Sequence, residues 1–253
     1  MTFSIVRAGA VLRKELREFR RNRFIVGTMI AVPLLFVIIP ISDLFRHAAP
    51  AVERIQVGTS LLLMLITPVI IPAAIAAYAV IGERDQGTLE PVLTTPVRRN
   101  ELLLGKATAA LIPAVAVAYL LFTIVVVAVH FGADQSVVAD VWQAQNFLAE
   151  ALFAPLLAGW SIWVGIAISS RSSDVRVAQQ LGTVASLPPL GVVALMSFQV
   201  LQSSITLAII LASILALADV AGWTLVATVF DRERLITGAK PVRALRRADR
   251  DGR

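Results

Sequence analysis

The sequence predicts an all-α integral membrane protein with six transmembrane helices, and three observations support this fold class. Of its 253 residues, 57% are hydrophobic and 16% charged, with a mean hydropathy of +0.79. Soluble domains are about 45–50% apolar and about 25% charged. The charged residues gather in blocks separated by long uncharged runs, and Lys and Arg concentrate in alternate blocks.

Four uncharged runs are long enough to cross a hydrocarbon core of about 30 Å, which takes about 20 helical residues. A further stretch, 177–230, has 54 residues and a single charge, Asp219. As one helix it would be about 81 Å long, so the chain must turn inside it, at the polar cluster 199–204. The predicted spans are 24–42, 55–82, 107–131, 148–170, 181–201 and 205–230.

The basic residues predict the orientation of these spans. Of the 23 Lys and Arg residues, 21 fall in alternate segments that begin with the N-terminal one. Cytoplasmic segments carry this excess, so both termini are expected in the cytoplasm, including the basic tail 231–253. This topology accounts for the net charge of +6 and disfavours nucleic acid as a partner. The predicted outer segments are too short for an independently folded domain.

Residues 1–23 predict an amphipathic helix that lies in the interface at the cytoplasmic face. Apolar residues recur at helical spacing, and basic residues, Lys14 among them, cover the remaining surface. Such a helix places its basic side chains among lipid phosphates. The alternative is a basic leader that only sets the topology. The apolar stripe consists of Ile5, Gly9, Leu12, Leu16 and Phe19.

The segment 83–106, between the second and third spans, predicts two helix starts rather than an open linker. Gly87 suits a left-handed helix end, and Thr88 with Glu90 suits the start of a short helix. Thr95-Pro96 suits a second start. The segment carries four basic and four acidic residues, a balance that favours docking on a protein over docking on anionic lipid. The alternative is a solvated turn.

This segment carries a resemblance to a known family. The pattern Gly82-Glu83-x-x-x-Gly87-Thr88-Leu89-Glu90, then Leu93-x-Thr95-Pro96-Val97-x-Arg99-x-Glu101, then Leu104-Gly105-Lys106, resembles the cytoplasmic loop of ABC-2-type transporter permeases. The end of the last span, Phe230-Asp231-Arg232-Glu233, is similar to the Phe-x-Arg-Glu ending common in that family. The six-span layout and the N-terminal helix also fit.

The resemblance implies the transmembrane subunit of an ATP-driven exporter in a prokaryotic plasma membrane. Such a subunit forms a homodimer or a heterodimer with a second permease, and the substrate path lies between the two. Separate ATPase subunits, which bind ATP and magnesium, dock at the cytoplasmic face through a short coupling helix and the N-terminal helix. The implied coupling residues are Glu83, Arg84, Gly87, Thr88, Leu89, Glu90, Pro96, Arg98, Arg99 and Glu101, with Leu12, Lys14, Leu16 and Phe19 on the N-terminal helix.

Several kinds of chemistry find no support in the residues. The chain has no cysteine, and its two histidines, His47 and His130, stand 83 positions apart, so no metal site is predicted. The phosphate-binding pattern G-x-x-x-x-G-K-[ST] is approached at Gly105-Lys106. There, Asn100 replaces the first glycine and Ala107 the Ser or Thr. We therefore expect no bound cofactor and no enzymatic activity in this chain.

Asp219 is a candidate residue of the substrate path. It lies 14 residues into the last predicted span, where a carboxylate costs a few kcal/mol and is functional by default. It supports an alternative function, a secondary transporter that uses Asp219 as a proton or cation site. A non-transporting membrane scaffold is a further alternative. Glu150, at the outer end of the fourth span, is expected in the interface.

Prolines and small residues predict how the spans pack. Pro188-Pro189 should make the fifth span irregular. Small residues repeat every four positions on two spans, and we expect them to pack helices closely within one chain. They are Ser161, Gly165 and Ser169 on the fourth span and Ala208, Ala212 and Ala216 on the sixth.

Overall fold

A computed structural model describes residues 3–45, 50–78, 81, 97–172, 174–197 and 205–229. All regular elements in these ranges are helices, which confirms the predicted all-α class. Residues 83–96 of the predicted coupling segment and the tail 231–253 lie outside the described residues. The helices are α1 (Ile5–Arg21), α2 (Arg23–Leu44), α3 (Pro50–Tyr78), α6 (Arg99–Gly132), α7 (Gln135–Val141), α8 (Ala144–Ser169), α9 (Val175–Ala185), α10 (Leu187–Ser197) and α11 (Ile205–Val229).

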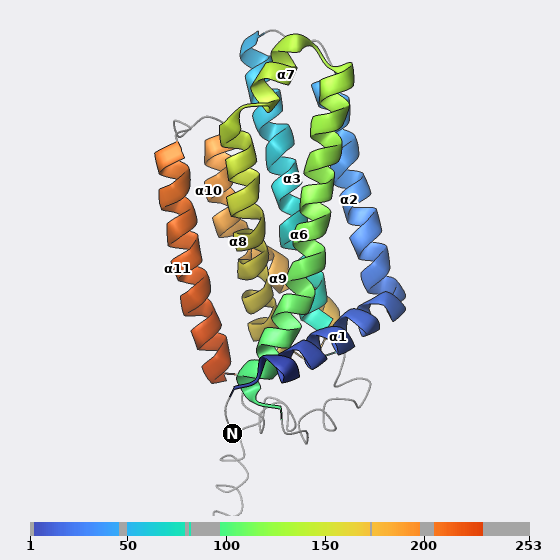
Figure 1. The fold of residues 1–253 in the computed structure, drawn as a ribbon, viewed down its shortest axis with the longest axis vertical. Helices are drawn as coiled ribbons and strands as arrows, with labels where there is room; N and C mark the ends of the chain where they lie inside the picture. Colours follow the sequence, from blue (N-terminus) through green and yellow to red (C-terminus); the bar gives the residue numbers. More distant parts are fainter. Residues whose placement is uncertain are drawn as a thin grey trace, which may run out of the picture.

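The long helices form an elongated bundle around α3 (Figure 1). Helix α3 packs against α2, α6, α8, α9 and α10, while α11 packs chiefly against α8. Helix α1 lies across one end of the bundle, and the short α7 lies at the opposite end (Figure 1). In the described part of the chain, five helices are long and apolar enough to cross a membrane, namely α2, α3, α6, α8 and α11.

Helix α6 is longer than a membrane crossing requires. Its 34 residues span about 51 Å at 1.5 Å per residue, against a hydrocarbon core of about 30 Å. Its first turns reach the end of the bundle where α1 lies (Figure 1). The extra length therefore places polar side chains at this end of α6 next to α1.

The predicted fifth span is two short helices in the structure. Asp174 starts α9 by accepting hydrogen bonds from the amides of Arg176 and Val177 at 2.7 and 3.3 Å. Helix α9 ends at Ala185, and α10 starts at Leu187, directly before the proline pair 188–189. Proline disfavours helical backbone in the preceding residue and suits a first helical turn. Each half has 11 residues, too few to span a membrane alone.

Side chains of neighbouring helices satisfy two of the carbonyl groups that prolines leave without helical partners. In a continuous helix the Ala185 carbonyl would accept from residue 189, but Pro189 has no N–H group. Trp160 Nε1 of α8 donates to this carbonyl instead, at 3.0 Å. The Ala151 carbonyl, which Pro155 leaves free in the same way, accepts from the Tyr119 hydroxyl at 3.1 Å. These two carbonyls are therefore paired although proline removes their helical donors.

The small residues on α8 let it approach α3 closely. Ser161, Gly165 and Ser169 are all buried inside the chain. A Cβ atom placed on Gly165 would lie 2.5 Å from the Cβ of Ala76 on α3. This stripe is thus an internal packing surface, as expected from its spacing.

Replacement of Gly165 by valine should destabilise the bundle. The added side chain would overlap α3, and overpacking of this kind costs about 1–3 kcal/mol. We expect the midpoint of thermal unfolding in detergent to fall by several degrees. Gly27→Val on α2 is the matched control, because a Cβ atom there meets nothing within 4 Å. Equal midpoints for the two variants would contradict the close α3–α8 contact.

Candidate functional site

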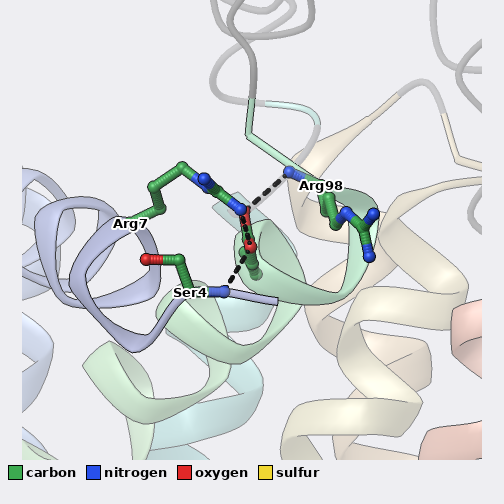
Figure 2. Close-up of polar contacts among 4 residues, drawn as sticks. Ser4, Arg7 and Arg98 are labelled. Atoms are coloured by element: carbon green, nitrogen blue, oxygen red, sulfur yellow. Dashed lines mark hydrogen bonds and ion pairs between the residues drawn. The ribbon is translucent and has the colours of Figure 1, made fainter. Parts of the chain in front are cut away.

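A buried carboxylate, that of Glu101, lies at the end of the bundle that α1 crosses. It is the third residue of α6, and its side chain is fully buried. Both oxygens accept two hydrogen bonds each (Figure 2). Oε1 accepts from Arg7 Nη2 at 2.6 Å and from the Ser4 amide at 2.7 Å. Oε2 accepts from Arg7 Nε at 2.8 Å and from the Arg98 amide at 2.9 Å.

The position of Glu101 follows from local helix chemistry. Arg98 is the N-cap of α6 and Ser4 the N-cap of α1. A glutamate at the third helical position reaches back to the N-cap amide, and here it also reaches the N-cap amide of the second helix. Its negative charge therefore lies at the positive ends of two helix dipoles. Hydrogen bonding to Glu101 raises the pKa of the Arg7 guanidinium above its usual value.

A second ion pair joins the same two helices. Lys106 Nζ of α6 lies 2.9 Å from Glu15 Oε1 of α1, and both side chains are almost fully buried. Between the two ion pairs, Gly105 lets the helices touch. A Cβ atom there would lie 2.6 Å from the Cβ of Val11. We call the set Ser4, Arg7, Glu15, Glu101 and Lys106 the α1–α6 junction.

Arg99 links the start of α6, next to the junction, to α11. Its Nη1 donates to the carbonyl of Ala227 at 3.2 Å. Ala227 lies in the last turn of α11, where carbonyls lack helical donors and a positive charge is favourable. Three helices thus meet where the predicted coupling segment ends.

The structure describes three of the ten predicted coupling residues, and it gives each a distinct place. Arg98 contributes its amide to Glu101, Arg99 contacts α11, and Glu101 holds α1. The other seven lie outside the described residues: Glu83, Arg84, Gly87, Thr88, Leu89, Glu90 and Pro96.

The residues predicted on the N-terminal helix take part in its packing, but the buried face is rotated. Leu12 and Leu16 pack partly buried against the core, and Phe19 is buried. Lys14 lies 3.2 Å from Glu18 and 3.4 Å from Glu15. However, the buried face runs through Ala8, Val11, Glu15 and Phe19, and Ile5 is 79% exposed. The hydrophobic spacing gave no reason to expect Glu15 on this face, because it does not register a buried acid paired with lysine.

The sequence-based prediction missed Arg7, Glu15 and Lys106 as junction residues. A signal for them exists in the order of charges: α1 carries a base and then an acid, and the start of α6 carries an acid and then a base. Opposite orders allow two ion pairs at once when the helices cross. This pattern can be recognised only when the contact between the helices is known.

Asp219 lies at a different place, on the face of α11 that meets α8. Trp163 Nε1 of α8 donates to its Oδ1 at 3.1 Å. A Cβ atom on Gly159 would lie 2.9 Å from Oδ2, so α8 leaves room for the carboxylate. Glu150, which the sequence places at the outer end of the fourth span, is buried against neighbouring helices. Its Oε1 atom has no hydrogen-bond partner among the described residues.

Comparison with known proteins decides the family. Residues 9–231 match the model of the ABC-2 family transporter proteins. This chain belongs to the ABC-2 transporter family. A stretch of 104 residues is also 35% identical to a protein of Pseudomonas aeruginosa described as "Probable ABC transporter permease protein NosY". The match covers 38% of this chain and 36% of the length of that protein.

In this ABC-2 protein, loss of one partner of the Glu15–Lys106 pair should be strongly destabilising. Lys106→Met leaves the buried carboxylate of Glu15 with Lys14 as its cation, which is partly exposed and 3.4 Å away. Removal of one partner of a buried pair costs up to about 3–5 kcal/mol. The double variant Glu15→Leu/Lys106→Met should recover most of this loss, because no charge stays buried. Equilibrium unfolding in detergent measures both variants as a double-mutant cycle.

Glu18→Gln is the control for that cycle, because Glu18 makes an exposed ion pair with Lys14. Its effect on the free energy of unfolding should stay below about 1 kcal/mol. Strictly additive effects of the Glu15 and Lys106 substitutions would contradict a direct buried interaction.

Proposed function

We propose that this chain is the membrane-spanning permease subunit of an ATP-driven exporter. It works as a dimer, as two copies or with a second permease, and separate ATPase subunits bind at its cytoplasmic face. Membership of the ABC-2 family supports the transporter class, and the name of the Pseudomonas protein agrees with it. ATP and magnesium bind to the partner subunits, and this chain contributes the substrate path and the docking surface.

One observation carries the assignment of the docking surface: Glu101, which lies in the segment 83–106, accepts hydrogen bonds from α1 and from the Arg98 amide at the start of α6. Because Arg99 also contacts the last turn of α11, a force applied to the segment would act on α1, α6 and α11 together. A docking segment needs this kind of rigid attachment if ATP binding is to move the spans.

The distribution of basic residues supports the orientation of the proposed permease. The α1–α6 junction lies in the segments that carry 21 of the 23 Lys and Arg residues, so this end of the bundle is assigned to the cytoplasm. Helices α9 and α10 together would form the fifth span, which brings the number of membrane crossings to six. Their combined length of 22 helical residues is enough for one span.

The first test asks whether an ATPase binds to the predicted coupling segment. The tagged chain, purified from its native membrane in mild detergent, should carry vanadate-sensitive ATP hydrolysis. Glu83→Arg/Glu90→Arg should remove that activity, because two reversed charges oppose docking onto a complementary surface. Asp134→Arg/Asp140→Arg makes the same change in charge at the α7 end of the bundle and should leave the activity in place.

Absence of ATPase from the wild-type preparation, under conditions that keep other transporter complexes intact, would overturn the proposal. A secondary transporter would then be favoured, with Asp219 as its proton or cation site. A transport activity that depends on an ion gradient and is lost in Asp219→Asn would support that alternative. An intact assembly without flux would support the scaffold.

The second test concerns the orientation of the chain and whether α9 and α10 together cross the membrane. The chain has no cysteine, so single cysteines can report topology without other changes. An impermeant maleimide added to intact cells should label Ser136→Cys and Gln202→Cys. Arg13→Cys and Arg176→Cys should react only after the membrane is permeabilised.

Position 176 lies in the first turn of α9, and position 202 follows α10 in the sequence, so they bracket the broken span. Labelling of both from the same side would show that α9 and α10 do not cross the membrane. Labelling of Arg13→Cys in intact cells would reverse the proposed orientation.

A further inference from the structure

Helix α1 has a row of arginines on the face opposite to its buried one. Arg13, Arg17, Arg20 and Arg21 follow one another at spacings of four, three and one residues, so they lie on one side of the helix. All four are exposed. We call these four residues the arginine row.

The arginine row has no acidic partner in the described part of the chain. Helix α1 has two acidic residues, and lysines use both of them. Glu15 pairs with Lys106 and Lys14, and Glu18 pairs with Lys14. Within the described ranges, the four guanidinium groups of the row make no hydrogen bond or ion pair. The row therefore presents positive charge to whatever lies outside the chain.

The connection between α1 and α2 sets the depth of the row. Asn22 alone separates the two helices, and the apolar span within α2 begins at Ile25. Arg21 is four residues before Ile25, at most about 14 Å along the chain. Helix α1 lies across the end of the bundle rather than along it (Figure 1). The row thus runs close to the level where the hydrocarbon core gives way to the polar headgroups.

The flank of α1 next to the row also faces the first span. Leu12 and Leu16 pack partly buried against the same core cluster that contains Ile25 of α2. At the start of the helix, Ile5 and Val6 are almost fully exposed. Apolar side chains beside a basic face are typical of helices that lie in a membrane interface.

We propose that the arginine row binds the phosphate groups of anionic phospholipids in the leaflet next to α1, which is the cytoplasmic leaflet in the proposed orientation. Guanidinium groups bind phosphate through paired hydrogen bonds, and clusters of four or more basic residues next to a span are typical of anionic-lipid sites. The structure narrows the lipid contact to these four residues, because Arg7 and Lys14 pair with acids of the chain itself. The site depends on the membrane-spanning fold and not on ATP hydrolysis.

The sign of the charges favours lipid over a protein partner. Protein surfaces that dock on each other have complementary charges, and the segment 83–106 carries four basic and four acidic residues. The arginine row has one sign only, and it lies at the edge of the hydrocarbon core. A layer of phosphates is the surface that matches it.

Quenching of a fluorescent label on α1 by brominated lipids tests this site. The chain has no cysteine, so Ala10→Cys places a single bimane on an exposed position one turn before Arg13. In phosphatidylcholine vesicles, a small fraction of brominated phosphatidylglycerol should quench this label more than the same fraction of brominated phosphatidylcholine. We expect phosphatidylglycerol to associate roughly fivefold more strongly. The preference should fall at about 1 M salt, where charges are screened within about 3 Å.

Substitution of the whole row should abolish the preference. Arg13→Gln/Arg17→Gln/Arg20→Gln/Arg21→Gln still leaves 17 basic residues in the cytoplasmic segments against two outside, so its topology should be unchanged. The corresponding Arg→Lys variant keeps the charge and should keep most of the preference. The matched control makes four Arg→Gln changes in the tail and should behave like wild type. Its positions are Arg243, Arg246, Arg247 and Arg250.

Three results would overturn the lipid site. One is equal quenching of wild type by the two brominated lipids. Another is an unchanged preference in a Gln variant that elutes and melts like wild type. The third is a Gln variant that keeps its lipid preference but loses the co-purified ATPase, which would assign this face to the ATPase. The vesicles need no ATPase, so failure of the lipid site is separate from failure of the permease proposal.

Discussion

The hydrogen-bonded carboxylate of Glu101 fixes the geometry of one whole end of this molecule. A helix that lies across the end of a bundle has little apolar surface to bury, and α1 buries only one narrow face. Two buried ion pairs therefore hold it to α6. Because a buried carboxylate is tolerated only when its oxygens are satisfied, Glu101 requires the N-cap amides of both helices to converge on it. Its four hydrogen bonds set the position of α1 and of the residues that precede α6.

Helix α8 has a corresponding role inside the bundle. Its two indole N–H groups donate to acceptors on neighbouring helices. One acceptor lies at the break between α9 and α10, and the other is the acid on α11. Trp160 satisfies the carbonyl that Pro189 leaves free, and Trp163 satisfies one oxygen of Asp219. The Ser161 hydroxyl also donates to Ser186 at the same break, at 3.0 Å. One helix thus stabilises two irregularities that apolar packing could not accommodate.

Sequence patterns predicted the helical class well because hydrocarbon thickness imposes long uncharged runs on the chain. They also identified Pro188-Pro189 and the small residues on α8, since both act through local backbone chemistry. Contacts between distant segments were harder to predict. The burial of Glu15 depends on Lys106, 91 positions away, and the place of Asp219 depends on Trp163, 56 positions away. A periodicity argument treats each helix alone, so it gave no reason to expect Glu15 on the buried face of α1.

The α1–α6 junction and Asp219 lie at different depths in the bundle, and α11 connects them. Asp219 and Ala227 are eight residues apart on this helix, about 12 Å by helical rise. Arg99 holds the Ala227 carbonyl, while Trp163 holds Asp219. A contiguous path is not yet a coupling, which requires an element with two arrangements. At the break between α9 and α10, the Ala185 carbonyl accepts from one donor on α8 rather than from its own helix. A shift of α8 relative to that break would exchange one hydrogen bond, a small cost compared with disrupting a continuous helix.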